Sequence, residues 1–199
     1  MQIESLTKIT TARAADICAL AAAGGFKLSA PEGASPAQYL NELIAGRKLE
    51  QAIQFFAFAL PPREAVWWTC LCSRAVFPEP TPKPLLDAVE AAEAWVRKPT
   101  EESRRAAMAC AQATDFQSPA TWAAVAAFWS GGSLAPADLP EVPVPAHLLG
   151  VAVAGAIALA AVQSEPQRAE QKREHYLASA IDVANGGNGR VKPATAPTG

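Results

Sequence analysis

Two cysteines on either side of a single leucine, Cys70 and Cys72, are the residues whose type and spacing could support metal or redox chemistry. No motif links either histidine, His147 or His175, to this pair. If residues 62–77 form a helix, a rotation of about 100° per residue directs the two thiols about 160° apart, whereas the ligands of one zinc ion must converge. We therefore expect no metal and no cofactor here, and interpret the cysteines as small buried apolar residues.

Catalytic motifs are missing from the sequence, which contains no GxSxG, HExxH, CxxC or glycine-rich phosphate loop. Glu93 and Glu101 stand four residues before Arg97 and Arg105, which is the spacing of ordinary surface pairs on a helix. We therefore expect a protein that is not an enzyme. A helical enzyme with an unrecognised pocket remains an alternative, which a cluster of buried polar groups in a cleft would support.

The tryptophans beside the cysteines predict two different environments. On the expected helix, Trp67 lies one turn from Arg63 and about two turns from Arg74, so its ring could stack between two guanidinium groups. We expect these three residues either to form a partner-binding surface or to close the edge of the core. Trp68 is expected to be buried.

The surrounding sequence predicts an all-α fold. Half of the residues are hydrophobic, and alanine-rich runs such as AVEAAEAWV and GVAVAGAIALAAV favour helix. Ser35-Pro36 followed by Gln38 has the pattern of a capping box, and Ser118-Pro119 repeats its first two signals. The expected helices are 11–23, 36–46, 48–60, 62–77, 83–97, 100–113, 119–130, 145–163 and 166–184.

Short connections between these helices predict a compact bundle of about eight to nine antiparallel helices, stacked as solenoid-like hairpins. Residues 1–185 are expected to form a single helical domain. The last residues, 186–199, are rich in Gly, Pro and Thr and offer little apolar surface, so we predict a disordered C-terminal tail there.

Charge is almost absent from Phe116 to Ser164, where Asp138 and Glu141 are the only formally charged residues. Two predicted helices lie in this stretch. They form the core beneath the other helices, or they expose an apolar patch to a partner protein or to a second copy of the chain. The candidate contact residues are Trp122, Phe128, Trp129, Leu148 and Leu149.

Overall charge and hydropathy argue against two other classes of partner. A net charge of −2 does not favour binding to nucleic acid. Residues 142–164 carry no charge, but Pro143, Pro145 and His147 leave an apolar run shorter than the roughly 20 residues of a membrane span. Residues 1–25 lack the pattern of a signal peptide, so a cytoplasmic location is expected.

Three runs within residues 62–130 carry a family resemblance: PREAVWWTCLCSRAV, LLDAVEAAEAWVRKPTEESRRAAMACAQ and TWAAVAAFW. They resemble an uncharacterised all-helical family of Proteobacteria that is found near type VI secretion genes. The middle run is also similar to helical proteins described as putative immunity proteins. The matching positions are packing residues, with no catalytic residue to carry over: Trp67, Trp68, Cys72, Trp95, Arg104 and Arg105.

The resemblance implies a protein that handles or neutralises an effector by binding it. We expect a non-enzymatic helical module, an adaptor or chaperone for an effector of type VI secretion. The alternative is an immunity protein that neutralises a toxin by binding. An immunity protein more often presents a concentrated acidic or polar surface, so the uncharged stretch and the small net charge favour the adaptor.

Overall fold

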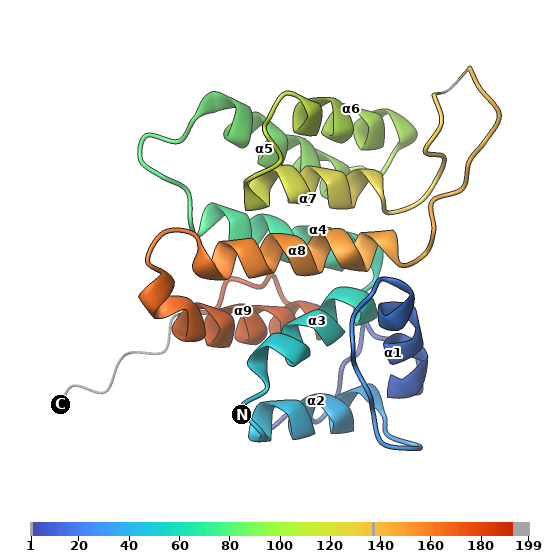
Figure 1. Cartoon of the computed structure of the whole chain (residues 1–199), viewed down its shortest axis with the longest axis vertical. Helices are drawn as coiled ribbons and strands as arrows, with labels where there is room; N and C mark the ends of the chain where they lie inside the picture. The colour runs from blue at the N-terminus through green and yellow to red at the C-terminus, as the bar shows by residue number, and fades with distance from the viewer. Residues whose placement is uncertain (1, 137, 193–199) are drawn as a thin grey trace.

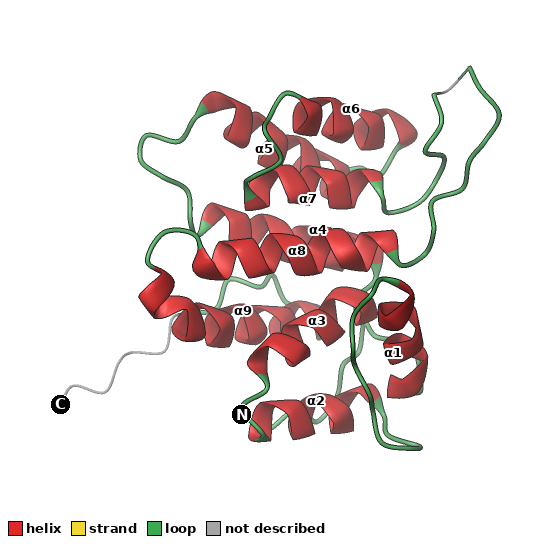
Figure 2. Cartoon of the chain, viewed as in Figure 1, coloured by secondary structure: helices red, strands yellow, loops and turns green. Residues whose placement is uncertain are grey.

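The computed structural model describes residues 2–136 and 138–192. This part of the chain forms nine α-helices and one short 3-10 helix, and contains no strand (Figure 2). The all-α fold predicted from the sequence is confirmed. The helices are α1 (Ala14–Ala23), α2 (Pro36–Ala45), α3 (Leu49–Ala59), α4 (Pro62–Arg74), α5 (Lys83–Arg97), α6 (Glu101–Gln112), α7 (Pro119–Phe128), α8 (Leu148–Val162) and α9 (Ala169–Ala184), and the 3-10 helix is η1 (Pro166–Arg168).

Helix starts follow the capping signals of the sequence. At α2, the Ser35 hydroxyl accepts from the Gln38 N–H at 3.3 Å, and the Gln38 side chain accepts from the Ser35 N–H at 2.8 Å. Thr100 and Ser103 form the same reciprocal pair at α6, and Ser118 caps α7. Each cap satisfies N–H groups that have no partner within their own helix, so local sequence determines where these helices begin.

The helices stack in layers along the long axis of the molecule (Figure 1). At one end, α5, α6 and α7 pack together; α4 and α8 form the next layer, followed by α9 and α3, and then by α1 and α2. α7 packs back against α4, α5 and α6. After α7 the chain returns, and α8 lies between α7 and α3. The two uncharged helices therefore occupy the middle of the bundle.

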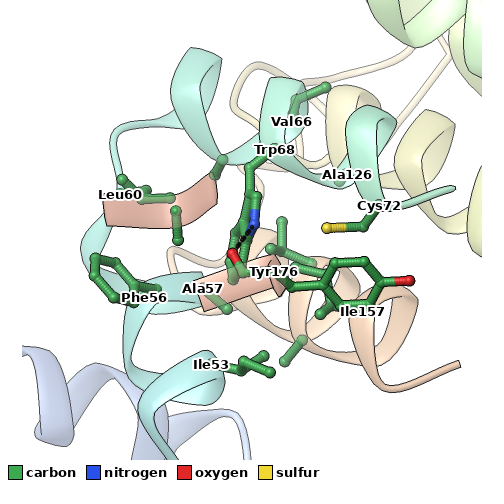
Figure 3. Close-up of a cluster of buried hydrophobic side chains, with 14 of the residues drawn as sticks. Ile53, Phe56, Ala57, Leu60, Val66, Trp68, Cys72, Ala126, Ile157 and Tyr176 are labelled. Carbon is green, nitrogen blue, oxygen red and sulfur yellow. Dashed lines mark hydrogen bonds between the residues drawn. The ribbon is translucent and has the colours of Figure 1, made fainter. Parts of the chain in front are cut away.

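The centre of the core is built around Trp68 on α4 (Figure 3). Its ring is fully buried and meets Phe56 edge to face, with the centroids 6.2 Å apart. Its indole N–H donates to the Tyr176 carbonyl of α9 at 2.9 Å. This bond satisfies the single polar atom of the ring, so the expected burial of Trp68 is confirmed.

A buried arginine anchors the long loop between α7 and α8. Arg104 on α6 is 4% exposed and pairs with Glu101 through two hydrogen bonds of 2.6 and 2.8 Å. It also donates to the carbonyl oxygens of Phe128 and Ser133, at 2.6 and 2.8 Å. A Cβ on Gly132 would come within 3.0 Å of the guanidinium. The first residues of the loop therefore pack closely against the Arg104 guanidinium.

The predicted end of the folded domain at residue 185 lies too early. Gly189 is buried: its carbonyl accepts from the Ser179 hydroxyl at 2.7 Å, and its N–H donates to Asp182 at 2.8 Å. A Cβ on Gly189 would meet Leu71 at 2.6 Å, and its φ of +73° suits glycine. Residues 186–190, the C-terminal turn, therefore pack onto the bundle, while 193–199 of the predicted tail lie outside the described residues.

In the described ranges, no single helix is long and apolar enough to span a membrane. By length and composition, α8 passes such a test only together with the segment Pro166–Ala184, and the two are bent by 114° relative to each other.

Candidate partner-binding surfaces

Three aromatic side chains form a row along α7. Phe116, just before the helix, meets Trp122 with the ring centroids 6.3 Å apart, and Trp122 meets Trp129 at 6.1 Å. The indole N–H of Trp122 donates to the Phe116 carbonyl at 3.0 Å. Phe116 is 38% exposed, and the two tryptophans are half-buried. This aromatic row, Phe116–Trp122–Trp129, is an apolar surface fixed by its own ring contacts.

The first ring of the row is carried by a strained residue. Phe116 has a φ of +59°, a left-handed conformation that is uncommon for a bulky side chain and costs of order 1–3 kcal/mol. The helix cap at Ser118 and the bond from Trp122 to the Phe116 carbonyl hold this conformation on either side. A strained residue that presents an exposed phenyl ring is a candidate for function.

The five candidate contact residues of the uncharged stretch differ in how exposed they are. Trp122 and Trp129 belong to the row, and Leu148 and Leu149 are half-buried at the start of α8. The prediction that Phe128 contacts a partner is wrong. Its side chain is buried (7% exposed), and the Arg104 guanidinium lies 4.4 Å from its ring centroid. An aromatic ring under a buried cation is part of the core and is closed to a partner.

The core interpretation of the uncharged helices holds for most of α7, while other parts of the uncharged stretch are exposed. α7 is buried by α4, α5, α6 and α8, so most of it is core. Among the residues that the structure describes, the large hydrophobic side chains that remain well exposed also lie in this uncharged stretch. They are Phe116, Leu139, Val142 and Val162. Sequence reasoning missed these four because the absence of charge does not distinguish a loop tip from a helix face.

The second predicted surface, around Trp67, has different partners from those expected. The Trp67 indole N–H donates to the Asn188 carbonyl at 2.9 Å, and Arg190 lies 5.9 Å from the ring centroid. Arg63 donates to the Val96 carbonyl at 2.7 Å instead of stacking on the indole. The C-terminal turn supplies the cation that faces Trp67, so the predicted stack between Arg63 and Arg74 is wrong.

Arg74 instead pairs with Glu93 on α5, through two hydrogen bonds of 2.5 and 2.9 Å. This pairing overturns the expected surface pair of Glu93 with Arg97. The other expected pair, Glu101 with Arg105, is present at 2.6 Å. Because Glu93 is engaged by α4, Arg97 is left without a carboxylate partner among the described residues.

A cleft of about 390 Å³ opens beside Trp67 and brings four distant segments together. The segment before α1 contributes Lys8, and the exposed last residue of α5 is Arg97. Lys8 and Glu64 form a loose ion pair, with Nζ and Oε1 3.7 Å apart, which is beyond hydrogen-bond distance. The lining residues of this Trp67 cleft are Lys8, Arg63, Glu64, Trp67, Val96, Arg97, Val183, Gly186 and Gly187.

A family model described as a family of unknown function, DUF6931, matches residues 39–184. The chain belongs to the DUF6931 family. No curated protein and no solved structure matches it. The matched segment includes the whole aromatic row. Lys8 and the C-terminal turn lie outside it, so the Trp67 cleft is completed by residues on both sides of the DUF6931 segment.

The two cysteines of the DUF6931 segment, Cys70 and Cys72, are buried, and each lies against a different helix. Cys70 lies near Glu93 of α5, whereas Cys72 faces Tyr176 of α9. Burial raises the pKa of both thiols well above the ordinary range, so they stay protonated near neutral pH, and a protonated thiol is neither a nucleophile nor a metal ligand. Within residues 2–136 and 138–192, no three His, Cys, Asp or Glu side chains gather in a way that could hold a metal ion.

Proposed function

We propose that this DUF6931 protein is a cytoplasmic protein-binding module that acts as an adaptor for a secreted effector, without catalysing a reaction. The aromatic row supports this proposal. Tryptophan and phenylalanine are enriched in the cores of protein–protein interfaces, where tryptophan side chains often dominate the binding energy. The resemblance to proteins found near type VI secretion genes suggests the kind of partner.

The apolar character of the aromatic row favours a role as an adaptor over a role as an immunity protein. Phe116 lies next to Trp122, and Val162 ends α8 near the start of α7, where Gln163 and Ser118 line one depression. Such a face suits an apolar segment that must be kept from aggregating before secretion. Burying one phenylalanine-sized side chain yields about 1.5–3 kcal/mol, which corresponds to roughly 10- to 150-fold in affinity.

Phe116→Asp is the most informative variant. The substitution places a charge in the row, and the backbone accepts it because Asp adopts left-handed φ values more readily than Phe. Ala19→Asp is the matched control, since Ala19 is an exposed residue of α1, at the opposite end of the bundle (Figure 1). Both variants should keep the helical circular dichroism spectrum of the wild type.

Tagged protein is to be expressed in its native host, and co-purified proteins quantified by mass spectrometry. We expect an effector protein to be recovered with the wild type and with Ala19→Asp, and at least about tenfold less of it with Phe116→Asp. Secretion of that effector should fall in the Phe116→Asp strain, while resistance of the strain to the effector is unchanged. Equal recovery with all three proteins refutes the row as the binding face, and a loss of resistance favours the immunity protein.

A further inference from the structure

We propose that the Trp67 cleft binds an acidic segment of a protein partner, at a site separate from the aromatic row. The cleft has three cationic side chains, Lys8, Arg63 and Arg97, against one carboxylate, Glu64. Between the charges, its wall is apolar and includes the Trp67 ring. Its volume of about 390 Å³ lies within the range of ligand sites, about 300–1,000 Å³.

Unpaired arginines gather at this cleft. Most arginines of the described chain have a carboxylate partner: Arg13, Arg47, Arg74, Arg104, Arg105 and Arg168. Four have none among the described residues: Arg63 and Arg97 line the cleft, Arg190 faces the Trp67 ring from the C-terminal turn, and the fourth is Arg173. A guanidinium presents parallel N–H donors that match a carboxylate. The cleft therefore offers donors that the described residues leave open to a ligand.

The helix ends at the cleft favour dispersed carboxylates over a phosphate group. Phosphate is commonly held by backbone N–H groups at a helix N-terminus, but at the start of α4 Pro61 and Pro62 have no N–H, and Glu64 places a carboxylate in the first turn. α5 and α9 direct their C-terminal ends, at Val96 and Val183, toward the cleft. A C-terminal end carries partial negative charge, which disfavours a compact dianion.

An acidic peptide avoids this repulsion because its charges are spaced along the chain. Arg63 and Arg97 are exposed and lie close together, because Arg63 bonds the Val96 carbonyl, while Lys8 reaches the cleft from a separate segment, so more than one carboxylate can be met. If two acidic residues of the peptide meet these cations, an apolar side chain between them would pack on Trp67 and Val183. The expected ligand is thus an extended segment in which acidic residues flank an apolar one. Lys8 and the C-terminal turn complete this site from outside the segment that the family model matches.

The probe is a fluorescein-labelled peptide in which pairs of glutamates flank one phenylalanine, measured by fluorescence anisotropy at low salt. Arg97→Glu is the main variant, because Arg97 is exposed and its side chain makes no hydrogen bond within the described chain. Arg173→Glu is the matched control: Arg173 also lacks a carboxylate partner there, but it lines a groove with Phe26. Lys8→Glu is a second test from a different segment, should Arg97→Glu fold poorly.

We expect Arg97→Glu and Lys8→Glu to weaken peptide binding at least about tenfold, the loss of roughly one charge-assisted hydrogen bond. Arg173→Glu and Phe116→Asp should bind as the wild type does, and ATP at the peptide concentration should not displace the peptide. The proposal is overturned if the wild type does not bind, or if Arg173→Glu weakens binding as much as Arg97→Glu. Displacement by ATP overturns the choice of carboxylate over phosphate, and weakening by Phe116→Asp overturns the separation of the two sites.

Discussion

Arg104 is the residue whose removal should disturb the loop between α7 and α8 most. We consider Arg104→Met, which keeps most of the side-chain volume and removes the charge and all donors. Glu101 would lose a partner but is 53% exposed, so water can solvate it. The buried Phe128 carbonyl would lose its side-chain donor, and the half-buried Ser133 carbonyl would lose one as well.

The size of the effect follows from these groups. An unsatisfied buried acceptor costs about 1–3 kcal/mol, and the half-buried one costs less. Loss of the cation above the Phe128 ring, 4.4 Å from its centroid, adds about 0.5–1 kcal/mol. The total is about 2–5 kcal/mol. In a chain of this length, each kcal/mol lowers the melting temperature by about 2–4 °C, so a fall of roughly 4–20 °C is expected.

Thermal unfolding followed by circular dichroism measures this change, and limited proteolysis measures opening of the loop around residues 131–147. Arg105→Met is the matched control, because Arg105 also bonds Glu101 and a loop carbonyl, that of Ala135, but is 30% exposed. We expect its melting temperature to fall by no more than about 2–4 °C. If Arg104→Met melts within 2 °C of the wild type and the loop stays protected, the loop is held by something other than this guanidinium.

Other consequences of the structure can be tested in the same way. Gly189→Val should destabilise the fold by more than about 1 kcal/mol, because its φ is positive and Leu71 and Val183 occupy the space of a Cβ; denaturant unfolding measures this. The half-buried Cys110 should react with a thiol reagent in the native protein, while Cys70 reacts only on unfolding, because burial raises its pKa and blocks access. Arg104 and Arg105 lower the pKa of Glu101 to about 2, so its contribution to stability should be full above about pH 4.5 and decline toward pH 2.

Each of these predictions has its own control. Gly25 also has a positive φ, of +88°, but no atom lies within 4 Å of a built Cβ. Gly25→Val should therefore cost less than Gly189→Val. Equal reaction rates of Cys110 and Cys70 in the native state would contradict their different burial. Glu101→Gln should lack the part of the acid destabilisation between pH 4.5 and pH 2 that the wild type shows; identical pH curves would show that Glu101 carries none of it.

Local sequence predicted the helices well because caps and breaks act over a few residues. Ser35, Thr100 and Ser118 each mark a helix start that the structure contains. Burial of Trp68 was also predictable, since apolar residues occur nearly all round its helix. These features depend on neighbours within one or two turns, which the sequence shows directly.

Features that depend on distant contacts were not predictable. Trp67 bonds a residue 121 positions away, in a stretch whose Gly-rich composition predicted disorder. Arg97 has the helical spacing to pair with Glu93, but α4 supplies Arg74 to that carboxylate. The strained Phe116 has no local signature, because its φ reflects how the α6–α7 connection closes. In both candidate surfaces, the helices were predicted from the sequence, but the residues that they contact within the chain were not.

The two ends of the described chain lie against each other: the Lys8 N–H donates to the Ala184 carbonyl at 2.8 Å, and the Thr7 N–H donates to the Asn185 side chain at 3.3 Å. Because synthesis runs from Lys8 toward Val183, Gly186 and Gly187, the Trp67 cleft cannot form until residues 183–187 have left the ribosome. Residues 116–129 of the aromatic row emerge long before. A nascent chain thus exposes the aromatic row before the cationic cleft exists, so a partner of the cleft can bind only after residues 183–187 have been made.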